Sequence, residues 1–362
     1  MEILYALIRS GLWSRPEALP EAGDWEKTRL VAEAQTVGGV VADGIGQNLA
    51  MLKATLPKMS MKLLSALVMG TEQVNLRMNA FLRSLFPRLE QAGIPVVVVK
   101  GQGVAQYYPE PLHRQAGDID LVVSREDFPR AEQWLTAASD KAFDKEESRL
   151  HEAFSFGDVT VELHGSLDTG ISGQVDRFLA GFQQEMLSSG HDLLWNEIPV
   201  PDGYHQTLYV FVHLLQHFFQ SGVGLRQLCD WAVLLHRHAG RMDTGRLERD
   251  LRAMGLLREW QVLGAFVVDR LGLPREEMPL YVPARKGKME RISQYVMRVG
   301  NMGKNIDRSY YGKDRFWIRK AKSLWLMVRD FLEQVWILPE GAWTALGCRL
   351  RTSLRTAFIE KK

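Results

Sequence analysis

Three acidic residues, Asp118, Asp120 and Glu162, have the types and spacing that metal-ion chemistry requires. Asp118 and Asp120 begin the segment 118–123, and residues two apart in a strand point to the same face. Two adjacent carboxylates raise each other's pKa unless a cation lies between them. Mg²⁺ suits such a pair, because it is commonly bound by one or two carboxylates together with substrate phosphates. A lone Asp-x-Asp is more often a polar turn before an edge strand, so the pair needs support from its surroundings.

The third carboxylate, Glu162, lies on an alternating segment. Residues 151–156 and 159–164 both alternate in polarity, and Gly157-Asp158 between them favours a hairpin turn. In the second segment Glu162 shares a face with His164, and a carboxylate flanked by apolar side chains needs a partner. Three carboxylates around two cations about 3.5–4 Å apart can hold the attacking and leaving oxygens of an in-line displacement.

A valine run and a glycine turn precede the aspartate pair. The run 96–99 is bounded by Pro95 and Gly101, which suits a strand buried on both faces. Gly101 and Gly103 allow a sharp turn and a close approach of the backbone to a ligand. Segment 104–108 can then begin a helix whose free N–H groups favour an anion. The stretch therefore contains the parts of a metal–triphosphate site.

These residues resemble the nucleotidyltransferase superfamily that includes DNA polymerase β, and more narrowly a bacterial branch of uncharacterised nucleotidyltransferases. The branch has Lys-Gly-x-x-x-Ala, Tyr-Pro, Arg and Asp-Ile-Asp-Leu, which this chain matches at Lys100-Gly101, Ala105, Tyr108-Pro109, Arg114 and 118–121. The resemblance spans roughly residues 80–240. Gln102 departs from the wider superfamily, which prefers Gly-Ser or Gly-Gly at the turn.

The resemblance implies an enzyme, dependent on Mg²⁺ or Mn²⁺, that moves a nucleoside monophosphate from an NTP to an acceptor and releases pyrophosphate. Asp118, Asp120 and Glu162 would bind the metal ions and form the catalytic centre. The nucleotide-binding candidates are Lys100, Gly101, Gln102, Gly103 and Arg114. Alternatively, Lys100 would form a surface ion pair and Arg114 would brace the loop. The acceptor stays open between a small metabolite or sugar phosphate of polysaccharide synthesis, a protein side chain and an RNA end.

A second group of candidates lies in segment 204–235. His213 and His217 are four residues apart, the spacing of a two-histidine zinc site, but no third ligand follows at a recognisable interval. A core or polar-network role is the alternative. Arg226 and Asp230 are also four apart and can pair on one helix face. The resemblance implies that these four residues line the nucleotide or acceptor pocket, and a buried salt bridge between two helices is the competing interpretation.

The elements around these residues predict an α+β protein. We expect a helical region at 1–92, a nucleotidyltransferase-like core with a small mixed sheet at 93–170, a helical region beside the site at 171–282 and a basic, helical region at 283–362. Periodicity predicts one long helix from Ser60 to Ala92 and a helix over 26–41 that Gly38-Gly39 interrupts. Residues 283–314, rich in glycine, are expected to contain loops between helices.

Composition favours a globular protein of the cytoplasm. The chain has 362 residues, 46% of them hydrophobic and 24% charged, and its two cysteines show no metal-ligand spacing. No stretch approaches ~20 apolar residues, so a transmembrane segment is not expected. Residues 271–362 carry 19 Lys and Arg against 9 Asp and Glu, a net charge of +10. Such a region suits nucleic acid, a membrane surface or an acidic partner, or else the solvated faces of packed helices.

Two other functions stay open. One is a catalytically silent nucleotide-binding or scaffold protein with the same fold, which predicts NTP binding without turnover. The other is a nucleic-acid-modifying nucleotidyltransferase that uses the basic C-terminal region, which predicts an affinity that falls steeply with salt. A kinase is disfavoured, because the sequence has neither a kinase-type glycine loop nor a His-Arg-Asp motif.

Overall fold

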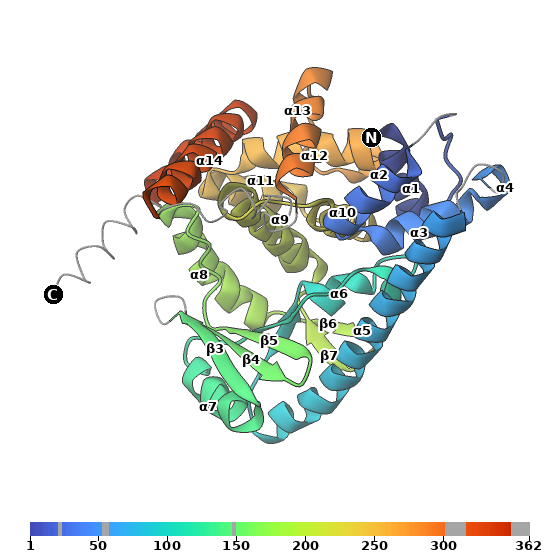
Figure 1. Cartoon of the computed structure of the whole chain (residues 1–362). Coiled ribbons are helices and arrows are strands. Elements are labelled where there is room, and N and C mark those ends of the chain that lie inside the picture. Colours follow the sequence, from blue (N-terminus) through green and yellow to red (C-terminus); the bar gives the residue numbers. More distant parts are fainter. Residues whose placement is uncertain (21–23, 53–57, 147–149, 301–315, 349–362) are drawn as a thin grey trace.

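A computed structural model describes residues 1–20, 24–52, 58–146, 150–300 and 316–348. Helices precede and follow one five-stranded sheet in the chain, which confirms the expected α+β class (Figure 1). The strands are β1 (Val97–Val99), β2 (Ile119–Val122), β3 (Lys141–Glu146), β4 (His151–Phe156) and β5 (Val159–His164). Their order is β1-β2-β5-β4-β3; among these described strands the β2–β5 pair is parallel and the others are antiparallel, so the sheet is mixed as predicted.

The hairpin of β4 and β5 has the register that its alternating pattern predicts. Val159, Val161 and Leu163 are buried, while the side chains between them are half-buried. Gly157 at the turn has φ +62°, which glycine adopts without steric cost. Facing β5 on its other edge, β2 places Asp120 opposite Glu162. The sheet therefore brings together residues that are 42 positions apart in the chain.

The N-terminal helices are α1 (Glu2–Trp13), α2 (Trp25–Ala34), α3 (Gly38–Gln47), α4 (Leu49–Leu52) and α5 (Lys58–Gln91). The predicted interruption at Gly38-Gly39 is wrong in its place, because the break lies before Gly38 and the glycine pair begins α3. Close packing explains the glycine, since a Cβ at Gly39 would lie 2.0 Å from the carbonyl oxygen of His113.

The long helix predicted from Ser60 to Ala92 is confirmed as α5, which has 34 residues. At 1.5 Å per residue it is about 51 Å long. It runs from the N-terminal helices down the side of the sheet (Figure 1). Its C-terminal half buries Met78, Leu82, Leu85 and Leu89 against strands β1, β2 and β5. Gly93 then ends it with φ +65° and delivers the chain into β1.

The remaining helices are α6 (Gly101–Ala105), α7 (Phe128–Ala138), α8 (Gly173–Ser188), α9 (Gly203–Gln220), α10 (Leu225–Arg237), α11 (Thr244–Met254), α12 (Leu257–Leu271), α13 (Lys286–Val299) and α14 (Phe316–Ile337). A short hairpin of β6 (Asp192–Leu194) and β7 (Ile198–Val200) interrupts the region expected to be helical. The loop prediction for 283–314 is wrong over α13, whose apolar stripe includes Ile292 and Val296, and residues 301–315 lie outside the described part.

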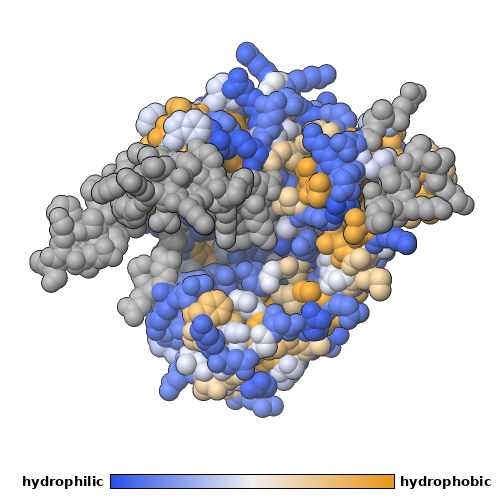
Figure 2. All heavy atoms as spheres, in the orientation of Figure 1, coloured by the Kyte–Doolittle hydropathy of each residue, from blue (hydrophilic) through white to orange (hydrophobic). Residues whose placement is uncertain are grey.

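Helix α14 packs one side on the protein and exposes the other. Phe331 and Val335 contact the main apolar core, whereas Trp325, Leu332 and Trp336 are exposed. Arg298 of α13 pairs with Asp330 and Glu333 of α14, so this basic side chain is already neutralised within the protein. In Figure 2 the coloured surface is largely hydrophilic, with smaller hydrophobic patches between. Among the described helices, none combines the length and apolar character needed to cross a membrane.

His113 joins the N-terminal helices to the loop before β2, and it makes stability depend on pH. Its Nδ1 lies 2.6 Å from Asp43 Oδ1 of α3 and its Nε2 lies 3.0 Å from Glu72 Oε1 of α5. The hydrogen bond with Asp43, above all, raises the pKa of His113 to about 9. The imidazolium therefore stabilises the folded state fully below about pH 6.5, the unfolded value, and this contribution is lost as pH rises through about 9.

We therefore expect the free energy of unfolding to fall between pH 6.5 and pH 9 in the wild type, and to fall less in His113→Asn. Urea denaturation at several pH values measures this difference. His236→Asn serves as the control, because it removes an exposed imidazole that also pairs with a carboxylate, that of Glu277. Parallel pH profiles of the wild type and His113→Asn would contradict the prediction.

Candidate functional site

The strand register brings the three predicted carboxylates together. Asp118 lies just before β2 and is half-buried, and Asp120 lies within β2 and is 3% exposed. Glu162 is the direct neighbour of Asp120 on the parallel strand β5. Burial, followed by the charges of Asp120 and Glu162, raises the pKa of Asp118 to about 6. The three groups therefore form a concentrated negative charge that a cation would relieve.

Lys100 supplies the positive charge that this cluster has in the structure. Its Nζ lies 2.7 Å from Asp120 Oδ1, and burial is outweighed by the attraction of Asp120, so the pKa of Lys100 is raised. The same ammonium group, assisted by His164, overcomes the effect of burial and lowers the pKa of Asp120. The ion pair predicted as the alternative for Lys100 thus exists, but it is buried at the carboxylates and not on the surface.

The backbone at Lys100 is strained. Its φ of 54° and ψ of −142° lie in a region that residues with a side chain rarely adopt. This conformation turns the chain from β1 into α6 and directs the lysine side chain to the carboxylates. Gly101, next in the chain, has φ +37°, and a Cβ there would lie 3.4 Å from the carbonyl oxygen of Asp118. The predicted glycine turn is therefore packed against the loop that carries Asp118.

The other residues of the turn contact protein. Gln102 is 2% exposed, and its Nε2 donates to Asn79 Oδ1 at 2.7 Å and to Asn75 Oδ1 at 3.1 Å, both on α5. A Cβ at Gly103 would lie 3.2 Å from Gln206 Nε2 of α9, so this glycine is closely packed against α9. The side chain of Gln102 therefore ties α6 to α5 and does not point to the carboxylates.

Two histidines that sequence reasoning did not assign to the site complete the cluster. His164 Nε2 lies 3.0 Å from Asp120 Oδ1 and 3.6 Å from Glu162 Oε2, and His151 Nε2 of β4 lies 3.5 Å from Glu162 Oε2. Although burial opposes the shift, hydrogen bonds from both histidines and the charge of Lys100 lower the pKa of Glu162. The sequence contained a signal for His164, because it shares a strand face with Glu162. His151 could be assigned to the site only with the register of the β4–β5 hairpin, which pairs it with His164.

The helix α9 places His213 and His217 beside Lys100. His213 Nε2 lies 3.4 Å from Lys100 Nζ and 2.9 Å from His217 Nε2, so the two histidines share a helix face as their spacing predicts. Burial and the positive charge of Lys100 lower both pKa values, that of His217 to about 4. Both imidazoles are therefore neutral near pH 7. They supply hydrogen-bonding groups next to Lys100 without adding charge.

The expected pairing of Arg226 with Asp230 is wrong. Asp230 instead accepts two hydrogen bonds from Arg114, at 2.7 and 2.8 Å, and one from Tyr108 Oη at 2.7 Å. Arg114 is only 5% exposed, and its contacts are those of the loop brace that the sequence left open as an alternative. Asp230 pairs with Arg114 because the loop before β2 brings this guanidinium to α10, although the two residues are 116 positions apart in the chain.

Arg226 turns toward the site. Its Nη1 donates to the carbonyl oxygen of Gln115 at 2.8 Å, and its Nε has no hydrogen-bond partner among the described residues. Burial lowers the pKa of Arg226, and the negative charge of Asp118 opposes this effect. The positive charge of Arg226 in turn favours the ionised form of Asp118. Arg226 is therefore a second cation close to the carboxylates, and its buried Nε lacks a hydrogen-bond partner among the described residues.

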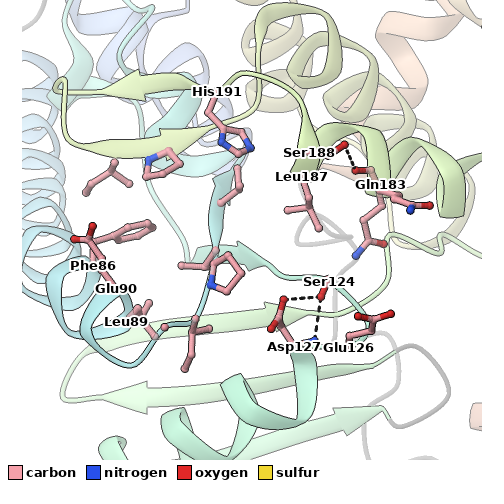
Figure 3. Close-up of a pocket in the computed structure, with 18 of the residues that line it drawn as sticks. Phe86, Leu89, Glu90, Ser124, Glu126, Asp127, Gln183, Leu187, Ser188 and His191 are labelled. Atoms are coloured by element: carbon pink, nitrogen blue, oxygen red, sulfur yellow. Dashed lines mark hydrogen bonds between the residues drawn. The ribbon is translucent and has the colours of Figure 1, made fainter.

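A large cavity lies elsewhere. It has a volume of about 1230 Å³ and occupies the opposite end of β1 and β2, between α5, α8, β7 and the loop 124–127 before α7. Phe86, Leu89 and Leu187 provide apolar surface, and Gln183 and His191 provide polar groups (Figure 3). None of the predicted site residues lines it. Its size does not identify the reactive centre, because the convergent charged groups lie at the other end of the strands.

The catalytic candidates lie within one known family of sequences. No curated protein matches the chain, and no solved structure matches it. A sequence model described as uncharacterised nucleotidyltransferase matches residues 21–272, which include the sheet, α5, α9 and α10. This match covers more than half of the chain, and the resemblance seen in the Lys-Gly and Asp-Ile-Asp-Leu motifs is confirmed. The chain belongs to this family of uncharacterised nucleotidyltransferases.

Proposed function

We propose that the protein transfers a nucleoside monophosphate from an NTP to an acceptor with release of pyrophosphate, at a centre formed by Asp118, Asp120 and Glu162. The convergence of these three carboxylates with Lys100 supports this proposal most strongly. The raised pKa of Asp118, at about 6, fits a group whose charge is not balanced by protein alone. Oxygen ligands of this type suit Mg²⁺ or Mn²⁺.

The proposed roles of the site residues follow from the charge of each side chain. Asp118 and Asp120 would hold divalent metal, with Glu162 completing the set. Bound divalent ions would polarise the α-phosphate and stabilise the charge that develops on the leaving pyrophosphate. Lys100 and Arg226, the cations near the carboxylates, would contact the phosphates. We propose that Arg114 shapes the loop before β2 through Asp230 and does not contact the nucleotide.

The transfer itself is a displacement at phosphorus. An acceptor oxygen forms a bond to the α-phosphorus while the bond between this phosphorus and the bridging oxygen to the β-phosphate breaks. The proton of an acceptor hydroxyl would pass to a carboxylate, for which Glu162 is the candidate. His213 and His217 would offer neutral hydrogen-bonding groups to the nucleotide or acceptor. A sugar phosphate or other small metabolite, a protein side chain and an RNA end all supply suitable acceptor oxygens.

The test is to incubate the full chain with each of the four NTPs, with Mg²⁺ or Mn²⁺, and to measure pyrophosphate release and incorporation of label from the α-phosphate. We expect pyrophosphate release or self-labelling with at least one NTP, lost on addition of a chelator. Metal-dependent NTP binding without release, in the presence of candidate acceptors of all three classes, would favour a silent nucleotide-binding protein. Failure to bind any NTP would contradict the proposal.

A further inference from the structure

A second group of metal-ligating atoms lies on strands β4 and β5. His151 and His164 are direct cross-strand partners, and Glu162 precedes His164 by two residues on the same strand face. Single ligand atoms of these three side chains all lie within 4.8 Å of one another. The side chains are 15–28% exposed, so an ion from solvent can reach them. Two adjacent strands fix the three groups, which makes the arrangement rigid.

The distances fit one particular coordination. Glu162 Oε2 lies 3.5 Å from His151 Nε2 and 3.6 Å from His164 Nε2. Four ligands at 2.0–2.1 Å around a tetrahedral zinc ion are separated by about 3.3–3.4 Å. The two distances from Glu162 are therefore within a few tenths of an ångström of those around such an ion, and the ligand nitrogens of His151 and His164 lie within 4.8 Å of each other. The octahedral shell of Mg²⁺ would bring adjacent ligands to about 2.9 Å and would use oxygen in place of imidazole nitrogen.

We propose that His151, Glu162 and His164 bind a divalent transition-metal ion of the Zn²⁺ class. Two imidazoles and one carboxylate form a donor set that favours such ions over Mg²⁺, because imidazole nitrogen is a softer ligand than the oxygens that Mg²⁺ prefers. Three protein ligands leave a coordination position open, as in catalytic zinc sites and unlike closed structural ones. The open position gives this ion access to a ligand or to substrate.

Asp120 lies beside this site. His164 Nε2 is 3.0 Å from Asp120 Oδ1 and 3.6 Å from Glu162 Oε2. A histidine must be deprotonated at the nitrogen that binds metal, so the ion would take the place of the contact between His164 and Asp120.

This site adjoins the proposed nucleotidyl-transfer centre but differs from it in its ligands. Glu162 is common to both and His164 contacts Asp120, whereas the two nitrogen ligands are given no part in the proposed transfer. Metal binding here does not depend on nucleotidyl transfer, so it can be measured without nucleotide. A protein that fails to turn over any NTP would still be expected to bind the ion.

The test is a titration of the metal-free full chain with Co²⁺, followed by competition with Zn²⁺ and with excess Mg²⁺. We expect one equivalent of Co²⁺ with the strong visible absorption of a four- or five-coordinate ion, displaced by Zn²⁺ but not by Mg²⁺. His151→Ala and His164→Ala should each weaken binding about 100-fold or more, since even indirect changes around metal ligands cost 10- to 100-fold. Far-ultraviolet circular dichroism shows that each variant is folded.

The matched variants separate this site from its neighbours. His236→Asn removes an exposed imidazole and should leave Co²⁺ binding unchanged. His217→Asn tests the other histidine pair, and a loss of Co²⁺ binding there would overturn the assignment. Asp118→Asn should keep the Co²⁺ spectrum while lowering pyrophosphate release, which distinguishes the two proposals. Absence of saturable binding, a thiolate-to-cobalt band or equal displacement by Mg²⁺ would also overturn the inference.

Discussion

Asp118→Asn is expected to lower the rate of pyrophosphate release by about 10³-fold or more. The substitution keeps the shape of the side chain and removes a charge that would hold metal, and loss of one preorganised electrostatic contact already costs about 10²–10³-fold in other enzymes. Asp118 is a sharper probe than Asp120, because Asp120 also balances the buried Lys100 ammonium. The measurement is the initial rate with the preferred NTP and metal ion.

The control for Asp118→Asn is Asp158→Asn on the tip of the β4–β5 hairpin. Asp158 is an exposed carboxylate that pairs with Arg77, and its replacement should change the rate by less than about twofold. Urea denaturation of both variants shows whether stability is kept. If Asp118→Asn retains wild-type activity, the carboxylate does not hold a catalytic metal ion and the proposed centre is wrong.

Arg114→Met is expected to lower the free energy of unfolding by about 3–5 kcal/mol. The substitution leaves the Asp230 carboxylate buried without its two guanidinium hydrogen bonds, and breaking a buried ion pair from one side has a cost of this order. Tyr108 Oη still donates to Asp230, but one neutral donor does not replace a charged partner. Urea denaturation at pH 7 measures the change.

Two further variants make the interpretation of Arg114→Met specific. The double variant Arg114→Met with Asp230→Leu removes both charges and should recover most of the lost stability, because a well-packed apolar pair often replaces a buried ion pair without loss. Arg252→Met breaks an exposed pair with Glu248 and should cost about 0.5 kcal/mol or less. Equal losses in Arg114→Met and Arg252→Met would show that Arg114 does not brace the loop.

The centre of the fold could be predicted because its elements carry strong local patterns. The valine run, the Asp-Ile-Asp-Leu strand and the alternating segment 159–164 became β1, β2 and β5 to within a residue or two. The hairpin turn at Gly157 fixed the register of β4 and β5. Pattern alone could place Asp118 and Asp120 on one face, and the parallel pairing of β2 with β5 then brought Glu162 to them.

Elements without such patterns could not be predicted. Strand β3, Lys141–Glu146, contains four charged residues in six and has an irregular register beyond Phe143. The turn between β6 and β7 has positive φ at both Trp195 and Asn196, where glycine or asparagine is usual at each place. Arg83 stacks over Trp195 at 4.4 Å, a long-range contact that favours this turn and leaves no local sign in the sequence.

The partner of Asp230 shows the same limit for side chains. Four-residue spacing on a helix predicts a local pair with Arg226, and this rule holds for exposed helices. Both residues lie on a buried part of α10, where the loop before β2 offers Arg114 in a bidentate geometry. A buried carboxylate is stabilised most by the partner that gives it more hydrogen bonds. The tertiary contact with Arg114 therefore replaces the local contact with Arg226.

The long helix α5 has a consequence for how the protein unfolds. The described residues form two apolar clusters, one mainly among the helices before and after the sheet and one around the sheet, and α5 contributes Leu64 to the first and Leu82 to the second. Fraying of α5 at its N-terminal end would expose the first cluster, and fraying at its C-terminal end would expose the second. A fragment that begins at Gly93 would lack the helix that covers its strands. Because α5 contributes side chains to both clusters, we expect them to unfold together in one cooperative transition.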